Sequence, residues 1–265
     1  MGNILEIKDL VSGYDAREVV RGVSFVLQRG SFIGIIGPNG AGKTTLLKSI
    51  SRMLKPKKGA IFYQGKDISS FRIKELARHL AVIPQDLEIP FSFTVGEFVK
   101  MGRFPHLGRF QKFKRHDHEA VEKALILTDT EGIAERKINE LSAGEKQRVI
   151  IAQGLAQEPE LLLLDEPTSH LDITHQVQIL NLLKRLNIEN NLTVMAILHD
   201  LNLASEFCKE LILMHNGRIH KMGLPQDVLT YRNIEDVYKT VVIVKENPLS
   251  GKPYVFVVPK NISDN

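Results

Sequence analysis

The chain has 265 residues, of which 43% are hydrophobic and 25% are charged, a composition typical of a soluble globular protein with a sizeable core. The formal net charge of +4 is too small to indicate a nucleic-acid-binding protein by itself. The single cysteine, Cys208, excludes an internal disulfide, and the sequence has no apolar run of the roughly 18 residues that a membrane-spanning helix needs.

Apolar patterning along the chain predicts alternating strands and helices. The apolar runs at residues 161–165 and 192–198 show no polar alternation, which indicates strands buried on both faces. A helix from residue 43 is expected to reach residue 54, because Lys55-Pro56 then blocks its continuation. The remaining strands are expected at residues 4–10, 23–28, 31–36, 60–64, 80–83, 211–214 and 218–221, and the remaining helices at 72–78, 173–189 and 201–208.

This alternation predicts an α/β fold with a mostly parallel sheet wrapped by helices. Residues from about 91 to 155 interrupt the alternation, and we expect them to form an inserted helical subdomain. The core is then expected to comprise residues 1–90 and 156–224, with a small C-terminal extension over 225–265. Together these parts predict a single domain over 1–265.

Residues 37–44 match the phosphate-binding loop pattern, with Gly, Gly, Lys and Thr at the required spacing. The predicted strand before the loop and the helix after it let backbone N–H groups surround a phosphate. Lys43 would then reach the outer phosphates, and the Thr44 hydroxyl would hold Mg²⁺. The alternative is a glycine-rich turn that merely carries a lysine, and both flanking elements disfavour it. The predicted nucleotide contacts come from Gly37, Pro38, Asn39, Gly40, Ala41, Gly42, Lys43, Thr44 and Thr45.

Polar residues follow three of the predicted strands. Open α/β sheets place their sites at the carboxyl ends of strands, so Asp165 can hold Mg²⁺ while Glu166 faces an attacking water. His199 ends the next buried strand and could contact the γ-phosphate, and Gln85 could touch Mg²⁺ or the water. The structural alternatives are an acidic turn, a strand-end histidine and a solvated turn glutamine.

Residues 141–145, Leu-Ser-Ala-Gly-Glu, precede a helix that is expected to run to about residue 157. Ser142 has the chemistry of an N-cap, and Gly144 lets a backbone approach closely. The same residues also suit an anion site at a helix N-terminus, and the spacing leaves both interpretations open. Tyr14 could stack on an adenine ring or be a half-buried loop tyrosine.

These motifs together resemble the nucleotide-binding subunit of ABC transporters over almost the whole chain. Residues 37–44 resemble the Walker A loop, and residues 161–166 resemble the Walker B strand with its catalytic glutamate. The resemblance implies an ATPase with a P-loop core, an N-terminal antiparallel β element, and ATP and Mg²⁺ as cofactors. It assigns the Q-loop glutamine to Gln85, the switch histidine to His199, the D-loop to residues 169–172 with Asp172, the adenine-stacking aromatic to Tyr14 and the signature motif to residues 141–145.

The signature motif departs from the usual Leu-Ser-Gly-Gly-Gln at Ala143 and Glu145. Since an acid near a phosphate is unfavourable, the Glu145 side chain is expected to point away or to pair with a base such as Lys146 or Arg148. In this family two subunits meet head to tail around ATP. The resemblance therefore implies a homodimer in which Ser142 and Gly144 serve the nucleotide of the partner subunit, and the D-loop residue Asp172 is a further predicted nucleotide contact.

Several stretches resemble the ATPases of type II importers, which take up iron–siderophore, haem or cobalamin; they include residues 101–106, 199–204 and 246–253. This resemblance implies a peripheral protein at the cytoplasmic face of the membrane and integral membrane permease subunits as partners. A permease helix would enter a groove near Gln85 and residues 91–110, and a substrate-binding protein would be an indirect partner. We expect no nucleic-acid partner; the alternative is a soluble ABC ATPase that acts on nucleic acid or ribosomes. The ATPase never touches the cargo, so its sequence does not identify the cargo directly.

Overall fold

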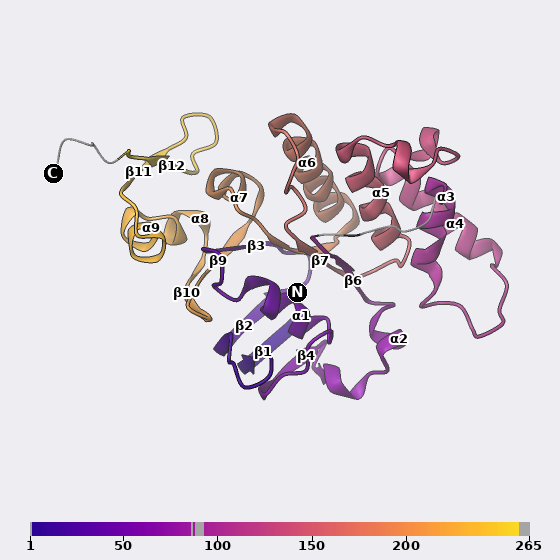
Figure 1. Cartoon of the computed structure of the whole chain (residues 1–265), viewed down its shortest axis with the longest axis horizontal. Helices are drawn as coiled ribbons and strands as arrows, with labels where there is room; N and C mark the ends of the chain where they lie inside the picture. The colour runs from indigo at the N-terminus through magenta and orange to yellow at the C-terminus, as the bar shows by residue number, and fades with distance from the viewer. Residues whose placement is uncertain (1, 86, 88–92, 260–265) are drawn as a thin grey trace.

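The central layer of the molecule is a six-stranded sheet (Figure 1). The structure is a computed structural model that describes residues 2–85, 87 and 93–259. Neighbouring strands pair in parallel, except in the β9–β10 hairpin at one edge. The prediction of a mostly parallel sheet is therefore confirmed. The strand order is β10 (Arg218–Gly223), β9 (Glu210–His215), β3 (Phe32–Ile36), β8 (Thr193–Ile197), β7 (Leu161–Asp165) and β6 (Leu80–Ile83).

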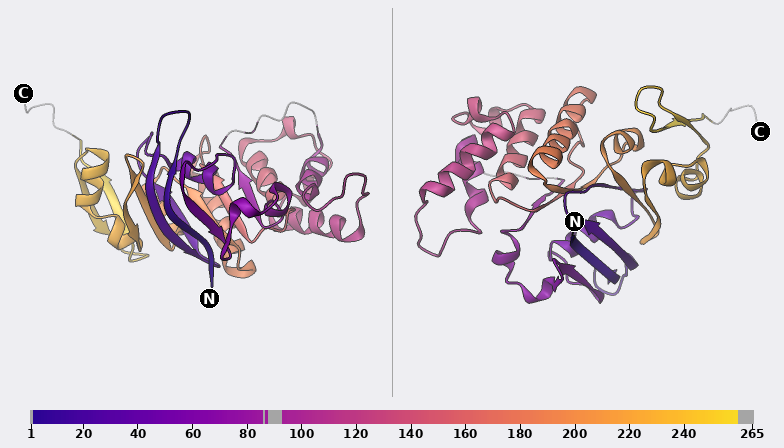
Figure 2. Two further views of the ribbon diagram at one scale, coloured as in Figure 1. Left: turned by 90° about the horizontal axis from the view of Figure 1, so that it is seen from below. Right: turned by 180° about the vertical axis from the view of Figure 1, so that it is seen from behind.

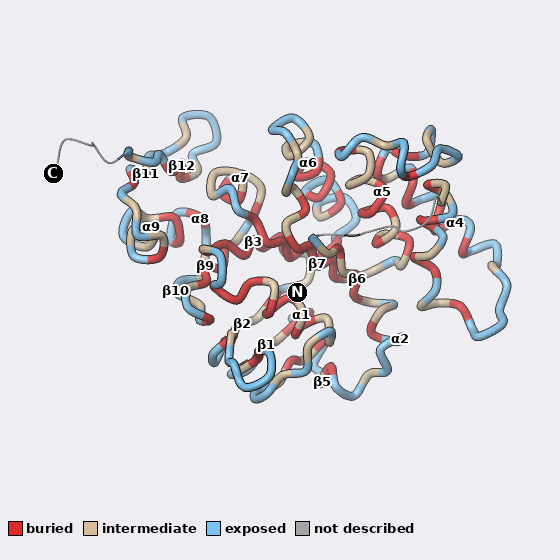
Figure 3. The backbone as a smooth tube through the Cα atoms, viewed as in Figure 1, coloured by how far each residue is buried: buried red, intermediate tan, exposed pale blue. Residues whose placement is uncertain are grey.

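Both faces of this sheet are covered. Every residue of β7 and of β8 is buried, as their unbroken apolar runs predicted, and Figure 3 shows the central strands as nearly continuous buried chain. Successive side chains of a strand point to opposite faces, so Leu162 and Leu164 join one hydrophobic cluster while Leu161 and Leu163 join another. Two hydrophobic cores therefore sandwich the sheet.

An antiparallel sheet and helix α1 (Lys43–Ile50) cover one face of the central sheet (Figures 1 and 2). This arrangement confirms the expected N-terminal antiparallel element. A short 3₁₀ turn, η1 (Ile68–Ser70), and helix α2 (Ile73–Leu76) then lead the chain to β6. The antiparallel sheet has the order β2 (Val20–Gln28), β1 (Asn3–Ser12), β4 (Lys58–Tyr63) and β5 (Lys66–Asp67).

Helix α1 is shorter than the sequence predicted, because it ends at Ile50 and not at residue 54. Arg52 adopts a left-handed conformation with φ of 61°, and the Leu54 amide turns back to donate to the Lys48 carbonyl at 3.0 Å. A left-handed residue just after a helix is a common C-terminal stop, but glycine usually occupies that position. Because an arginine occupies this position, the sequence did not indicate that the helix ends here. The other predicted elements differ from the observed ones only at their ends.

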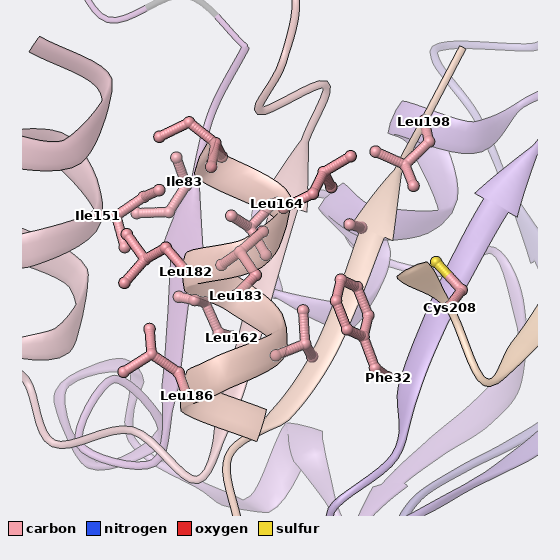
Figure 4. Close-up of a cluster of buried hydrophobic side chains, with 14 of the residues drawn as sticks. Phe32, Ile83, Ile151, Leu162, Leu164, Leu182, Leu183, Leu186, Leu198 and Cys208 are labelled. Atoms are coloured by element: carbon pink, nitrogen blue, oxygen red, sulfur yellow. The ribbon is translucent and has the colours of Figure 1, made fainter. Parts of the chain in front are cut away.

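Helices α5 (Ala143–Leu155), α6 (Ile173–Asn190) and α7 (Leu201–Phe207) cover the other face of the sheet. Figure 4 shows leucines of α6, among them Leu182, Leu183 and Leu186, packed against Leu162 and Leu164 of β7. This packing fixes α6 over β7. The start of α6 and the end of β7 are therefore held in place relative to one another.

A group of helices lies at one end of the molecule beside β6 (Figure 1). Its core includes a buried ionic network, in which Arg103, 1% exposed, donates to Asp117 at 3.0 Å, to Glu158 at 2.8 Å and to the Ala156 carbonyl at 2.7 Å. The expected boundary between residues 90 and 91 lies outside the described residues and stays a prediction. The group consists of α3 (Val95–Lys100), η2 (Met101–Arg103), α4 (Arg115–Leu127), η3 (Glu131–Ile133), η4 (Ile138–Glu140) and α5.

The C-terminal extension lies at the opposite end of the molecule (Figure 1). Asn202 of α7 exchanges two hydrogen bonds with the backbone of Val255, and Lys252 donates to the carbonyls of Ser205 and Glu206, each at 2.8 Å. Among the helices of the described part of the chain, none has the length and apolarity to cross a bilayer. The extension comprises α8 (Pro225–Val228), α9 (Tyr231–Tyr238), β11 (Val242–Glu246) and β12 (Pro253–Val257).

Candidate functional site

The glycine-rich loop predicted at residues 37–44 connects β3 to α1. Gly42 caps α1 with φ of 99°, and Gly37 has φ of 145°, so both lie where side chains are strained. A Cβ atom on Gly37 would also lie 2.3 Å from the carbonyl oxygen of Met214 on β9. The loop therefore needs glycine for its backbone path and for its close contact with β9.

Lys43 is the first residue of α1, and its side chain is 5% exposed. Its ammonium group donates to the loop carbonyls of Gly37 at 2.8 Å and Pro38 at 3.1 Å, so it lies inside the curve of the loop. Burial lowers the pKa of Lys43, while the charges of Glu166 and Asp165 oppose that shift. A cation held in this position suits the oxygens of a phosphate chain.

Thr44, the last residue of the loop, and Asp165 bring two side-chain oxygens together. The Thr44 hydroxyl donates to the Asp165 carboxylate at 3.1 Å. Burial raises the pKa of Asp165, and the hydrogen bond from Thr44 opposes that shift. Within residues 2–85, 87 and 93–259, no cluster of three or more His, Cys, Asp or Glu could enclose a metal. Mg²⁺ commonly takes one or two protein oxygens and completes its octahedron with water and phosphate, so the hydroxyl and carboxylate oxygens of this pair fit it.

Glu166 is the centre of a group of three side chains from neighbouring strand ends. Its two carboxylate oxygens contact His199 Nε2 at 2.5 Å and Gln85 Nε2 at 2.6 Å. Gln85 follows β6, Glu166 follows β7 and His199 follows β8, and these strands are adjacent in the sheet. Glu166 has φ of 53°, a conformation that non-glycine residues adopt only when the surroundings hold them there. The structure thus brings together the three predicted catalytic side chains.

These side chains and the loop share one open cavity of about 420 Å³. Sequence reasoning missed one of its residues, Val19, which precedes β2 and has no polar or glycine signal that could mark it. Tyr14, 46% exposed, is not among the residues that line this cavity, and it lies in the turn after β1. The lining consists of Val19, residues 39–45, Gln85, Glu166 and His199.

The signature-like segment lies apart from this cavity. Ser142 caps α5, as its chemistry predicted, with its hydroxyl accepting from the Glu145 amide at 3.3 Å. Neither Ser142 nor Gly144 lines the cavity, and nor does Asp172, which caps α6. Ser142 and Gly144, which were expected to serve a partner's nucleotide, and the D-loop residue Asp172 are thus separate from the loop of their own chain.

Glu145 pairs with a base, as expected, but this base is neither of the two named as examples. Its carboxylate turns back to accept from the Ser142 amide and hydroxyl, each at 2.8 Å, and pairs with Arg136 at 3.0 Å instead of Lys146 or Arg148. A glutamate in the third position of a helix reaches toward the N-terminus in a capping box, where Arg136 lies. The hydrogen bonds from Ser142 are the main reason that the pKa of Glu145 is lowered, so this acid is an anion at neutral pH.

Comparison with known proteins identifies the family. The profile of the ABC transporter family matches residues 20–169, more than half of the chain. The protein belongs to the ABC transporter family. This ABC protein is an ATPase that hydrolyses ATP for transport, and its phosphate loop is the Walker A loop that the sequence predicted.

Two curated ABC proteins share 39% identity with the chain. The ferric enterobactin transport ATP-binding protein FepC of Escherichia coli aligns over 248 residues, which cover 94% of this chain and 92% of FepC. The iron(3+)-hydroxamate import ATP-binding protein FhuC of Bacillus subtilis aligns over 251 residues, which cover 95% of this chain and 93% of FhuC.

A solved structure confirms the ABC ATPase fold over the whole chain. It is an inward-facing ABC transporter assigned to the metal-chelate type, with a TM-score of 0.86 and 28% identity, and the match covers 98% of this chain and 99% of the other. The agreement extends beyond the nucleotide-binding core, because this coverage includes the helical insert and the C-terminal extension.

Proposed function

We propose that this ABC ATPase is the energy-coupling subunit of an importer for a metal chelate such as iron–siderophore, haem or cobalamin. The observation that carries its catalytic part is Glu166, held between His199 and Gln85 at the edge of the cavity that also contains Lys43. The cargo class is supported by FepC and FhuC, whose names specify iron chelates and whose full length this chain nearly matches.

The residues at the cavity would have different roles in the hydrolysis of the phosphate bond. Loop N–H groups and Lys43 would bind the phosphate oxygens and stabilise the charge that develops on them. Thr44 and Asp165 would hold Mg²⁺, with Gln85 as a further ligand or a contact to the water. When bound, Mg²⁺ would neutralise charge on the β- and γ-phosphate oxygens.

Glu166 would orient the attacking water and accept its proton. Both of its carboxylate oxygens are held by neighbouring side chains, which limits their motion, and orientation of this kind can lower a barrier substantially. His199 would keep Glu166 in place and contact the γ-phosphate. Tyr14 is sufficiently exposed to receive an adenine ring.

The second half of the nucleotide site would come from a partner copy in a head-to-tail homodimer. Ser142, Gly144 and Asp172 lie outside the cavity of their own chain, which is the arrangement that such a dimer needs. The dimer would sit at the cytoplasmic face of the membrane, bound to permease subunits near Gln85 and the segment 91–110. Residues 91 and 92 of that segment lie outside the described residues.

Replacement of Glu166 by glutamine tests the catalytic assignment. Glu166→Gln should still bind ATP and associate, but hydrolysis should fall at least about 100-fold, because a general base contributes that much or more. The matched control is Glu119→Gln, which alters an exposed acid of α4 that pairs with Arg115. Persistent turnover in Glu166→Gln would contradict the assigned role.

Association with a permease tests the transport assignment. The wild-type chain should co-purify with a hydrophobic membrane partner, and its ATPase rate should rise in that complex. Full activity as a soluble dimer, with no membrane association in cells, would overturn the importer proposal. Salt-sensitive binding to RNA or DNA would instead favour the soluble ABC ATPase.

A further inference from the structure

The segment between Glu166 and α6 is fixed at both of its ends. At its start, Ser169 donates to the Glu166 carbonyl through its amide at 3.1 Å and its hydroxyl at 2.9 Å. At its end, Gln176 of α6 donates to the carbonyls of Thr168 at 3.3 Å and Leu171 at 3.0 Å. This D-loop therefore connects Glu166 to α6 through hydrogen bonds as well as through the chain.

His175, in the first turn of α6, closes this connection. Its Nδ1 lies 2.9 and 2.8 Å from the two carboxylate oxygens of Asp172, and its backbone amide donates to the same carboxylate at 2.9 Å. This pairing adds a side-chain contact to the usual helix cap, because both the ring and the amide of His175 hold the Asp172 carboxylate.

The other edge of the His175 ring packs against the signature segment. A Cβ atom on Gly144 would lie only 2.2 Å from His175 Cδ2 and 2.9 Å from its Cγ. Gly144 is buried, while the His175 side chain is 38% exposed. Helices α5 and α6 lie side by side in this region (Figures 1 and 2). One imidazole thus touches both the D-loop aspartate and the signature glycine.

We propose that His175 is a positioning residue that holds the D-loop and the signature loop as one unit. This proposal rests on the head-to-tail dimer proposed above, in which both loops reach the nucleotide site of the partner. Since Asp172 and Gly144 contact the same ring, they would approach the partner together and at a fixed spacing. The hydrogen bonds of Ser169 then link that unit to the backbone of Glu166.

Two single variants separate the two contacts of the ring. His175→Phe keeps an aromatic ring against Gly144 but loses the hydrogen bond to Asp172, whereas His175→Asn keeps a donor near Asp172 but loses the ring. We expect each to lower kcat/KM for ATP about ten-fold and His175→Ala to lower it further, because small displacements of positioned groups cost up to about 100-fold. The matched control is Gln178→Ala, which changes an exposed residue one turn along α6 and should match wild type.

A double-variant cycle tests the contact with Gly144 directly. Gly144→Ala should weaken ATP-dependent dimerisation of the Glu166→Gln protein, because the new methyl group collides with the ring. Adding His175→Ala removes that collision, so the double variant should be no weaker than Gly144→Ala alone. Strict additivity of the two effects would overturn the proposed contact.

A purely structural role for His175 gives a different result. In that case His175→Ala would lower the melting temperature, while the folded protein would retain wild-type kcat/KM and dimerisation, and the proposal would be wrong. This failure is distinct from failure of the proposed function. If the wild-type protein neither dimerises with ATP nor hydrolyses it, the dimer proposal is wrong. If the wild-type protein does both and the His175 variants match it, only the proposed positioning role is wrong.

Discussion

The buried ionic network around Arg103 offers a quantitative test of how the helical insert is held. Arg103→Met keeps most of the side-chain volume but removes the charge. The Asp117 side chain, 7% exposed, is then left without its ionic partner, and the Ala156 carbonyl loses a donor. Breaking a buried pair on one side typically costs about 3–5 kcal/mol, so we expect a loss of that size in the free energy of unfolding.

The pH dependence of this effect has a defined sign. Burial alone would raise the pKa of Asp117, but hydrogen bonds from the Lys114 amide and from Arg103, with the charge of Arg103, outweigh it and lower the pKa. A lowered pKa stabilises the folded state above the unfolded pKa of about 3.9, and this contribution disappears as the pH falls through the folded pKa. In Arg103→Met, the lowering effects of the Arg103 hydrogen bond and charge are lost, so the pKa of Asp117 should lie above its wild-type value. The stability difference between wild type and variant should therefore be largest near neutral pH and should shrink below pH of about 4.

Urea unfolding monitored by circular dichroism at several pH values measures both quantities. Arg115→Met is the control, because Arg115 is 93% exposed and its pair with Glu119 is worth about 0.5 kcal/mol or less. A loss below about 1 kcal/mol for Arg103→Met, or a difference that grows as the pH falls, would refute the argument. The result also bears on function, because Arg103 contacts Ala156 and Glu158, just before the strand that Glu166 follows.

Three further outcomes are expected. Glu145→Gln removes an anion from the signature segment and keeps the capping box. Added to the Glu166→Gln protein, it should lower the ATP concentration needed for dimerisation about two- to ten-fold, measured by sedimentation. Unchanged or weaker dimerisation would contradict this expectation. Gly37→Ala should abolish detectable ATP binding in a fluorescent-nucleotide titration, because its Cβ would collide with the Met214 carbonyl, and near-normal affinity would show that the loop can shift. Lys252→Met should destabilise the C-terminal hairpin by about 1–3 kcal/mol through lost hydrogen bonds to α7, seen as faster amide exchange over β11 and β12 but not over β7.

Sequence reasoning located the parts of the site that have a local signature. The phosphate loop and the two acids at the end of β7 are marked by short spacings and flanking apolar runs, which can be read directly from the sequence. Contacts between distant segments have no such signature. Three such contacts arise from tertiary packing. They are the ion pair of Glu145 with Arg136, the packing of the His175 ring against Gly144, and the position of Val19 in the cavity. Periodicity along the chain cannot encode them.

The backbone of Glu166 has a consequence for protein engineering. Its φ of 53° is a conformation that costs a non-glycine residue about 1–3 kcal/mol, and glycine would relieve that strain. A library screened for heat resistance alone would therefore tend to enrich glycine at position 166, and every such clone would lack the carboxylate proposed to orient the attacking water. Thermal selection of this protein needs a simultaneous screen for ATP turnover, because glycine at position 166 would favour stability whereas glutamate would favour ATP hydrolysis.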